Sequence, residues 1–113
     1  MVEQNQMNQI ILELCEGISS IFPHERMDPI LFGSYARGDA EDGSDIDVLL
    51  LVDTPREEIF QRNRQIGDVA GDLLLSYGIL VSPIVENRAY FDQNVDLLPF
   101  FRNIQREGVR VYA

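Results

Sequence analysis

The chain has 113 residues, a length that suits one compact domain, and we therefore expect residues 1–113 to form a single domain. Hydrophobic residues make up 45% of the chain and charged residues 25%, which argues against an intrinsically disordered protein. The formal net charge of −10, from 19 acidic and 9 basic residues, makes nucleic-acid binding by this chain alone unfavourable because phosphate would be repelled.

The single cysteine and the hydropathy of the chain restrict where the protein can work. Cys15 alone cannot form an intrachain disulfide, which fits a reducing compartment. No stretch approaches the ~20 apolar residues of a membrane-spanning helix, and the N-terminal "MVEQNQMNQ" lacks the charge and hydropathy pattern of a signal peptide. We therefore expect a cytoplasmic protein that does not associate with a membrane.

The first predicted elements are a helix and a short strand. Apolar residues recur at three- and four-residue steps from Met7 to Ile21, which predicts a helix that ends before Pro23. The run "PILFG" at 29–33 predicts a strand that stops at Gly33.

A second strand is expected over residues 45–52, "DIDVLLLV". Before it, Ser34 is expected to cap a short helical turn that ends at Arg37, and residues 38–44 are expected to form a loop. After Asp47 the second strand is apolar enough to be buried on both of its faces.

The next segment predicts one helix that begins near Thr54 and ends at Gly78. Thr54 is a candidate N-cap, and Pro55 would occupy the first helical position. The inward face is expected to hold Ile59, Ile66, Val69 and Leu73, with Phe60 as a further candidate.

A third strand, "ILVSPIV", follows, and Pro83 within it suggests an edge strand or a bulge. Two further helices are expected in "RAYFDQN" and "VDLLPFFRNIQREG", and "VRVYA" is expected to be a short last strand or a docked tail. This order predicts an α/β (α+β) fold, with a small mixed β-sheet and helices packed on it.

Two aspartates precede the most apolar strand, where acids are costly. Because side chains alternate along a strand, Asp45 and Asp47 should point to the same face. Two carboxylates on one face repel each other unless a positive charge lies between them. Their hard oxygens suit Mg²⁺, which predicts a metal site. The alternative is a solvated strand start with both acids facing water.

A phosphate site is expected beside these acids. Gly33 allows a sharp turn and a close approach of a ligand to the backbone. Ser34 offers a hydroxyl and opens a helical turn, and Arg37 can reach the same anion bidentately. The alternative for Arg37 is a surface salt bridge with Asp39 or Asp42. A phosphate site next to a metal site is typical of nucleotidyl transfer.

The stretch "FGSYARGDAEDGSDIDVLLLV" resembles the signature of the nucleotidyltransferase superfamily that includes DNA polymerase β, poly(A) polymerases and kanamycin nucleotidyltransferase. Through "GSYARG" it is most similar to the minimal nucleotidyltransferases of bacteria and archaea. The resemblance implies a polymerase β-like fold in which Gly33 and Ser34 hold the β- and γ-phosphates. It also implies that Asp45 and Asp47 are catalytic carboxylates that hold Mg²⁺, with a two-metal site as an option.

Further residues either match or depart from the family pattern. Ser44 matches a small polar residue that contacts phosphate beside the first aspartate, and Arg37 matches the arginine of the "ARG" step. The family usually has a third carboxylate on the next core strand, where it binds metal and helps to deprotonate the attacking hydroxyl. Here that position is Ser82 or Pro83. Glu86 shares a face with Ser82 only if the strand continues past Pro83; otherwise we expect Glu86 to be a surface acid.

The resemblance implies an enzyme that transfers a nucleoside monophosphate from a nucleoside triphosphate, expected to be ATP, to a hydroxyl and releases pyrophosphate. Minimal nucleotidyltransferases are commonly paired with a small helical HEPN-domain toxin, which they neutralise by binding, by adenylylation, or by both. The alternative is a catalytically weak or inactive nucleotide-binding regulatory module that lacks the third carboxylate. Homo- and hetero-oligomers are both compatible with the sequence.

Overall fold

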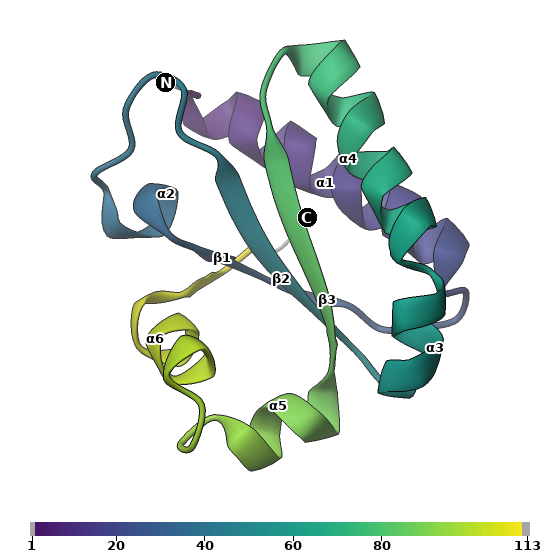
Figure 1. Ribbon diagram of the computed structural model, residues 1–113. Helices are drawn as coiled ribbons and strands as arrows, with labels where there is room; N and C mark the ends of the chain where they lie inside the picture. The colour runs from purple at the N-terminus through teal and green to yellow at the C-terminus, as the bar shows by residue number, and fades with distance from the viewer. Residues whose placement is uncertain (1, 112–113) are drawn as a thin grey trace.

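A four-stranded mixed β-sheet forms the centre of the computed structural model, which describes residues 2–111 (Figure 1). The strand order is β3-β2-β1-β4, and the strands are β1 (Asp28–Phe32), β2 (Ile46–Val52), β3 (Val81–Asn87) and β4 (Val109–Arg110). Strand β1 is antiparallel to β2 and to β4, whereas β2 and β3 are parallel. The predicted mixed sheet is confirmed.

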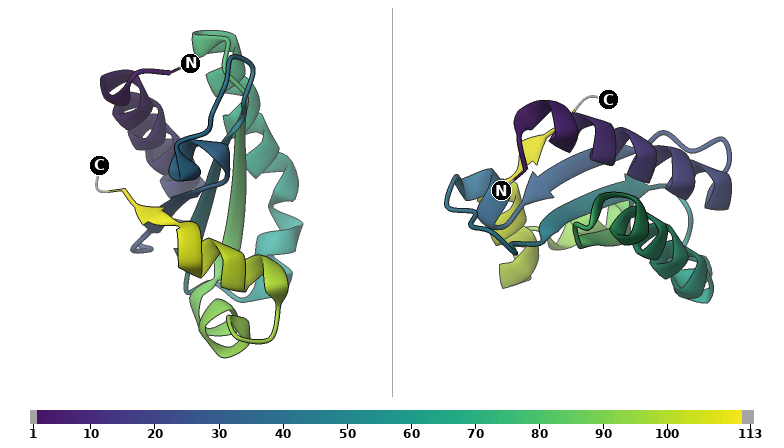
Figure 2. Two further views of the ribbon diagram at one scale, coloured as in Figure 1. Left: turned by 90° about the vertical axis from the view of Figure 1, so that its left-hand side faces the viewer. Right: turned by 90° about the horizontal axis from the view of Figure 1, so that it is seen from above.

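Helices connect the strands and cover the sheet. They are α1 (Gln4–Ile21), α2 (Ser34–Arg37), α3 (Arg56–Gln61), α4 (Asn63–Tyr77), α5 (Arg88–Asn94) and α6 (Pro99–Glu107). Helices α3 and α4 form the crossover that the parallel pair β2 and β3 requires. Viewed from above, α1 and α6 lie on opposite sides of the sheet (Figure 2).

The two faces of the sheet contribute to two hydrophobic clusters. Alternate residues of β2 point to opposite faces, so one set meets α1 and α4 while the other meets α5 and α6. The first cluster includes Met7, Ile10, Ile11, Leu14 and Ile18 of α1, Ile46, Val48, Leu50 and Val52 of β2, and Ile59, Ile66 and Leu73. The second consists of Ile30, Phe32, Leu49, Leu51, Phe91, Val95, Phe101 and Ile104. Strand β2 is therefore buried on both faces, as its sequence predicts.

The helical segment after β2 differs from its prediction. It is divided at Arg62, whose amide donates to the carbonyl of Ile59 in a tighter turn. Pro55, and not Thr54 as predicted, is the N-cap, and the Thr54 hydroxyl donates to Glu25. Phe60, expected to face inward, is 57% exposed.

The second half of the chain agrees with its predicted order. Strand β3 is an edge strand, and Pro83 pairs with Val48 in unbroken register, so the proline marks an edge rather than a bulge. Pro99 lies in the first turn of α6, and of "VRVYA" the last two residues lie outside the described part of the chain. Within residues 2–111, no helix is long and apolar enough to cross a membrane.

Candidate functional site

Three side chains from neighbouring strands form a row on one face of the sheet. Phe32 of β1 lies opposite Asp47 of β2, and Asp47 lies beside Ser82 of β3. Gly33 follows Phe32 directly. The sheet therefore brings the predicted phosphate loop and the predicted metal ligand together on the face that carries α5 and α6.

Gly33 and the Asp47 carboxylate are packed against each other. Gly33 has φ +74° and ψ −155°, a conformation that is essentially restricted to glycine. A Cβ atom at this position would lie 2.3 Å from Oδ2 of Asp47. Gly33 is also the N-cap of α2, so Ser34 is the first helical residue and does not cap the turn as expected. Any other residue at this position would displace the carboxylate.

The electrostatics of Asp47 indicate a site for a cation. Burial raises the pKa of the Asp47 carboxyl, the neighbouring Asp45 charge raises it further, and Arg37 partly opposes both effects. Ionised Asp47 is therefore unfavourable in the folded protein unless a positive charge offsets it. No group of three or more His, Cys, Asp or Glu side chains within residues 2–111 could hold a metal. Two carboxylates completed by substrate oxygens are a donor set that fits Mg²⁺.

We expect Asp47→Asn to raise the melting temperature of the metal-free protein at neutral pH. Because the pKa of Asp47 is raised on folding, its ionised form destabilises the folded state once the pH exceeds that pKa. The gain should disappear as the pH falls below about 3.9, the ordinary pKa of aspartate. Thermal unfolding across this pH range measures the effect. The same change at the exposed Asp68 of α4 should not reproduce it.

Arg37 lies close enough to Asp47 to lower its pKa, but its guanidinium is paired with other acids. Nε lies 3.2 Å from Asp39, and Nη1 lies 3.4 Å from Glu107 of α6. The alternative pairing with Asp39 is thus present, whereas the contact with Glu107 was not foreseen. Exposed pairs of this kind contribute about 0–1 kcal/mol, so Arg37 can exchange them for phosphate at little cost.

Ser44 closes the loop that leads into β2. Its hydroxyl accepts the Glu41 amide at 2.9 Å, and its own amide donates to the Glu41 carbonyl at 3.0 Å. The first bond uses the oxygen as an acceptor, so the hydroxyl hydrogen can still be donated to an anion. Ser44 is held next to Asp45, at the position where the family resemblance predicts a phosphate contact.

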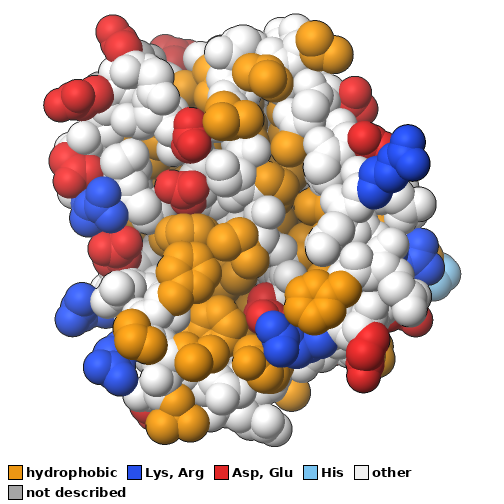
Figure 3. Space-filling view, viewed as in Figure 1, with side chains coloured by type: hydrophobic (Ala, Val, Ile, Leu, Met, Phe, Trp, Pro, Cys, Tyr) orange, Lys and Arg blue, Asp and Glu red, His pale blue; other side chains and the backbone are white. Residues whose placement is uncertain are grey.

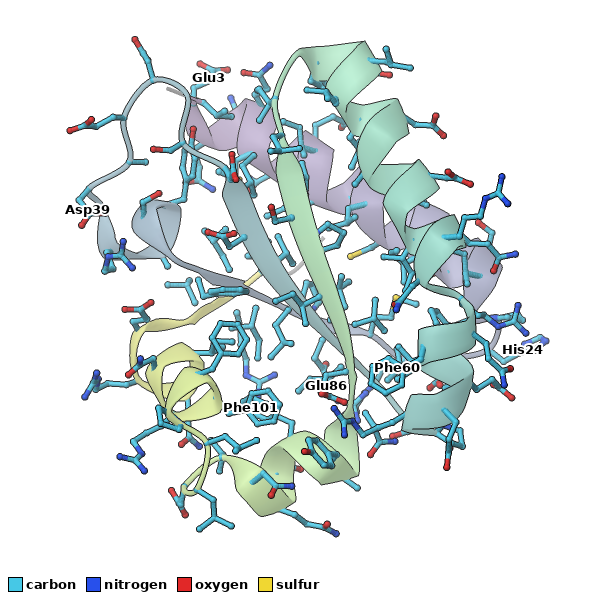
Figure 4. All side chains as sticks on the ribbon, viewed as in Figure 1. Glu3, His24, Asp39, Phe60, Glu86 and Phe101 are labelled. Carbon is cyan, nitrogen blue, oxygen red and sulfur yellow. The ribbon has the colours of Figure 1, made fainter. Side chains whose placement is uncertain are left out.

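Glu86 is not the surface acid that the sequence suggested. It is only 8% exposed, and it accepts two hydrogen bonds from Arg56, at 3.1 and 3.3 Å. Strand β3 does continue past Pro83, so Glu86 shares a face with Ser82. It nevertheless lies four residues further along the strand, about 13 Å away, next to Phe60 (Figure 4). Glu86 therefore cannot complete a metal site at Asp47.

The residues that hold Glu86 were not predicted from the sequence. The Arg56 guanidinium lies 3.6 Å from the ring centre of Tyr90 and 5.3 Å from that of Phe60. Arg56 comes from α3, Tyr90 from α5, and neither periodicity nor local spacing indicates that they meet. The strand alternation that places Glu86 on the Ser82 face was the only signal present in the sequence.

We expect Ser34→Ala and Arg37→Lys each to weaken triphosphate binding. The first removes a hydrogen bond to charged oxygen, worth ~1.5–3 kcal/mol, or about 10- to 100-fold in affinity. The second loses the bidentate fork, which lysine lacks. Calorimetric titration with Mg·ATP measures both. Ser76→Ala and Arg64→Lys, at exposed positions of α4, are matched controls. If both site variants bind like the parent, the Gly-Ser loop is only a turn.

The family model of the nucleotidyltransferase domain matches residues 11–108. The chain belongs to this family. Two candidate protein adenylyltransferases of Methanocaldococcus jannaschii are relatives of this nucleotidyltransferase. MJ0604 is 39% identical over 83 residues, 74% of this chain and 75% of its own. MJ0141 is 38% identical over 103 residues, 91% of this chain and 96% of its own.

Solved structures give the same fold. The crystal structure of a candidate nucleotidyltransferase from Sulfolobus solfataricus has a TM-score of 0.61 and 26% identity, over 95% of this chain and 80% of that one. A toxin–antitoxin structure with AMP-PNP has a TM-score of 0.59 and 21% identity, over 94% and 73%. The predicted fold and family are thereby confirmed, whereas the roles of individual residues stay predictions.

Proposed function

We propose that the protein is a Mg²⁺-dependent nucleotidyltransferase that transfers a nucleoside monophosphate, from ATP, to a hydroxyl group of a partner protein. The observation that carries this proposal is the packing of the Asp47 carboxylate on Gly33, with the Asp45 charge close enough to raise its pKa. This arrangement combines a glycine turn at the start of α2 with paired acids whose repulsion a cation would offset. The relatives named as protein adenylyltransferases support the same reaction class.

Different residues of the chain bind the phosphates and the metal. Gly33, Ser34 and Arg37 bind and orient the β- and γ-phosphates, and Asp45 and Asp47 hold Mg²⁺. When bound, the metal neutralises the charge of the phosphate oxygens and of the leaving group. The acceptor oxygen bonds to the α-phosphorus, while the bond breaks between that phosphorus and the oxygen that bridges the α- and β-phosphorus atoms. Pyrophosphate leaves with the electron pair, and the hydroxyl proton passes to solvent.

We propose that the acceptor protein is a small helical HEPN-domain toxin, which the protein neutralises in the cytoplasm by adenylylation, by binding, or by both. The structural neighbour described as a toxin–antitoxin with AMP-PNP supports a toxin as the partner and a nucleoside triphosphate as the ligand, and the HEPN class rests on the family resemblance. The net charge of −10 favours a basic partner protein over nucleic acid. A complex of this kind would require a buried interface of roughly 1,200–2,000 Å².

A second function is favoured by one observation, the serine beside Asp47. Ser82 stands where the family usually has its third carboxylate, and Glu86 is bound by Arg56 further along the strand. A site without this base can bind a nucleotide and transfer slowly or not at all. The alternative is therefore a nucleotide-binding regulatory module that inhibits its partner by binding alone.

Incubation of the protein with its gene-neighbour partner, Mg²⁺ and ATP labelled at the α-phosphate separates the two functions. Transfer predicts label on the partner, whereas ATP labelled at the γ-phosphate should leave it unlabelled. A nucleotide-dependent complex without label would instead support the regulatory module. Absence of both label and nucleotide binding would reject both functions.

A further inference from the structure

An exposed aromatic ring lies beside the predicted metal site. Phe100, in the first turn of α6, is 47% exposed. Its ring meets that of Phe32 edge to face, with centroids 5.7 Å apart and planes at 83°. Phe32 directly precedes Gly33 and lies opposite Asp47 in the sheet. The Phe100 ring is therefore one side chain away from both the phosphate loop and the carboxylates.

The contact with Phe32 of the hydrophobic core covers only part of the Phe100 ring. Its neighbour Phe101 is the buried residue of the pair and packs on Phe91, with ring centroids 4.9 Å apart. Phe100 instead keeps about half of its surface exposed. On the face shown in Figure 3, acidic side chains border an apolar area. A contiguous exposed apolar area with a polar rim marks interaction and ligand-binding surfaces more often than a single exposed side chain does.

Helix α6 carries the Phe100 ring near its start and a contact with the predicted phosphate site at its end. It begins next to Phe100 and ends at Glu107, which pairs with Arg37 at 3.4 Å. A nucleotide whose β- and γ-phosphates lie at Ser34 and Arg37, and whose α-phosphate lies at Asp47, has its nucleoside beyond Asp47. The Phe100 ring, which packs on Phe32 opposite Asp47, offers an apolar surface for a flat base in this region.

We propose that the Phe100 ring is the surface on which the base of the bound nucleotide stacks, an inference that rests on the proposed nucleotide site. Stacking of a base on an aromatic side chain contributes roughly 5- to 100-fold to affinity and depends little on which base is present. ATP and GTP should therefore benefit to a similar extent. Phe60, the other strongly exposed phenylalanine on this face, lies beside Arg56 and Glu86, far from Asp47.

Phe100→Ala should reduce Mg·ATP affinity about tenfold and leave the affinity for Mg·tripolyphosphate within about twofold of the parent, because tripolyphosphate has no base to stack. Calorimetric titration of both ligands measures the difference. Phe60→Ala is the matched control and should change neither affinity. If Phe100→Ala does not fold, Phe100→Leu keeps an apolar contact with Phe32 and tests the same comparison.

Phe100→Trp provides an independent measurement because the chain contains no tryptophan. ATP should quench the fluorescence of this single indole by stacking on it, whereas tripolyphosphate should not. Quenching by both ligands to the same extent would count against a base contact.

Unchanged ATP affinity in Phe100→Ala would overturn the inference and leave the phosphate site intact. Equal affinities of the parent for ATP and tripolyphosphate would also overturn the base contact and leave the phosphate site intact. If the parent binds neither ligand, the proposed nucleotidyl transfer fails together with the base contact. If the substitution weakens only the complex with the partner protein, this surface is a docking site and the base contact is rejected.

Discussion

Asp45→Asn is expected to reduce Mg²⁺-dependent ATP binding by at least about 100-fold, because even residues that only support a metal ligand contribute about 10- to 100-fold to metal affinity. Within residues 2–111, no group of three or more His, Cys, Asp or Glu side chains is placed to compensate. The substitution preserves the size of the side chain and removes its charge. Calorimetric titration with ATP in the presence and absence of Mg²⁺ measures the loss.

The fold should survive this change. Asp45 precedes β2, is only partly buried and raises the pKa of Asp47, so removing its charge relieves a repulsion. Residual ATP binding in the variant should no longer depend on Mg²⁺, whereas Asp68→Asn should bind like the parent. If Asp45→Asn keeps full Mg²⁺-dependent binding, the carboxylate pair is not the metal site and its position reflects a solvated strand start.

Local patterns in the sequence were sufficient for most of the helices and strands. Alternation along β2 predicted that Asp45 and Asp47 would share a face, and the apolar run after them predicted a buried strand. Both depend on neighbours in the chain, whose geometry is fixed by the backbone. The glycine and serine that begin α2 were likewise recognisable, although Gly33 and not Ser34 caps the helix.

Contacts between distant segments could not be predicted in the same way. Glu86 is buried because Arg56 reaches it from α3, and Arg56 is in turn stacked on Tyr90 of α5. Each residue alone looks like a surface residue, and only the packing of three elements shows otherwise. The contacts of Phe100 with Phe32 and of Glu107 with Arg37 also join segments far apart in the sequence.

The two ends of β3 differ in whether they carry a charged side chain. At one end, the buried Glu86 pairs with Arg56, whose side chain is 37% exposed, so loss of Arg56 would leave Glu86 without its cation but at a cost reduced by solvent screening. At the other end, Ser82 stands beside Asp47 without a charge. Glu86 on this strand therefore pairs with Arg56 of α3, and the position beside the proposed metal site has no carboxylate that could act as a base.

Ser82→Asp is expected to raise nucleotidyl transfer about 10²- to 10⁴-fold, the contribution of a well-placed general base. Ser82 lies beside Asp47 in parallel register, and β3 continues without interruption past Pro83. A carboxylate at this position therefore faces the same side as Asp47. Mg·ATP affinity should stay within a few-fold, because in the proposed site the triphosphate is held mainly by Gly33, Ser34 and Arg37.

Transfer of label from ATP labelled at the α-phosphate, with the partner protein present, measures this gain, and Ser82→Asn is the matched control because it has the same shape without the charge. If the parent already transfers briskly and Ser82→Asp adds nothing, the substrate's own phosphates accept the proton, since Glu86 is occupied by Arg56. Glu86→Gln should then leave transfer unchanged while it lowers the melting temperature.

If Ser82→Asp folds, binds ATP and still labels nothing, the missing carboxylate is not what limits transfer by the protein. It then acts by binding its partner, with the nucleotide as a regulatory ligand.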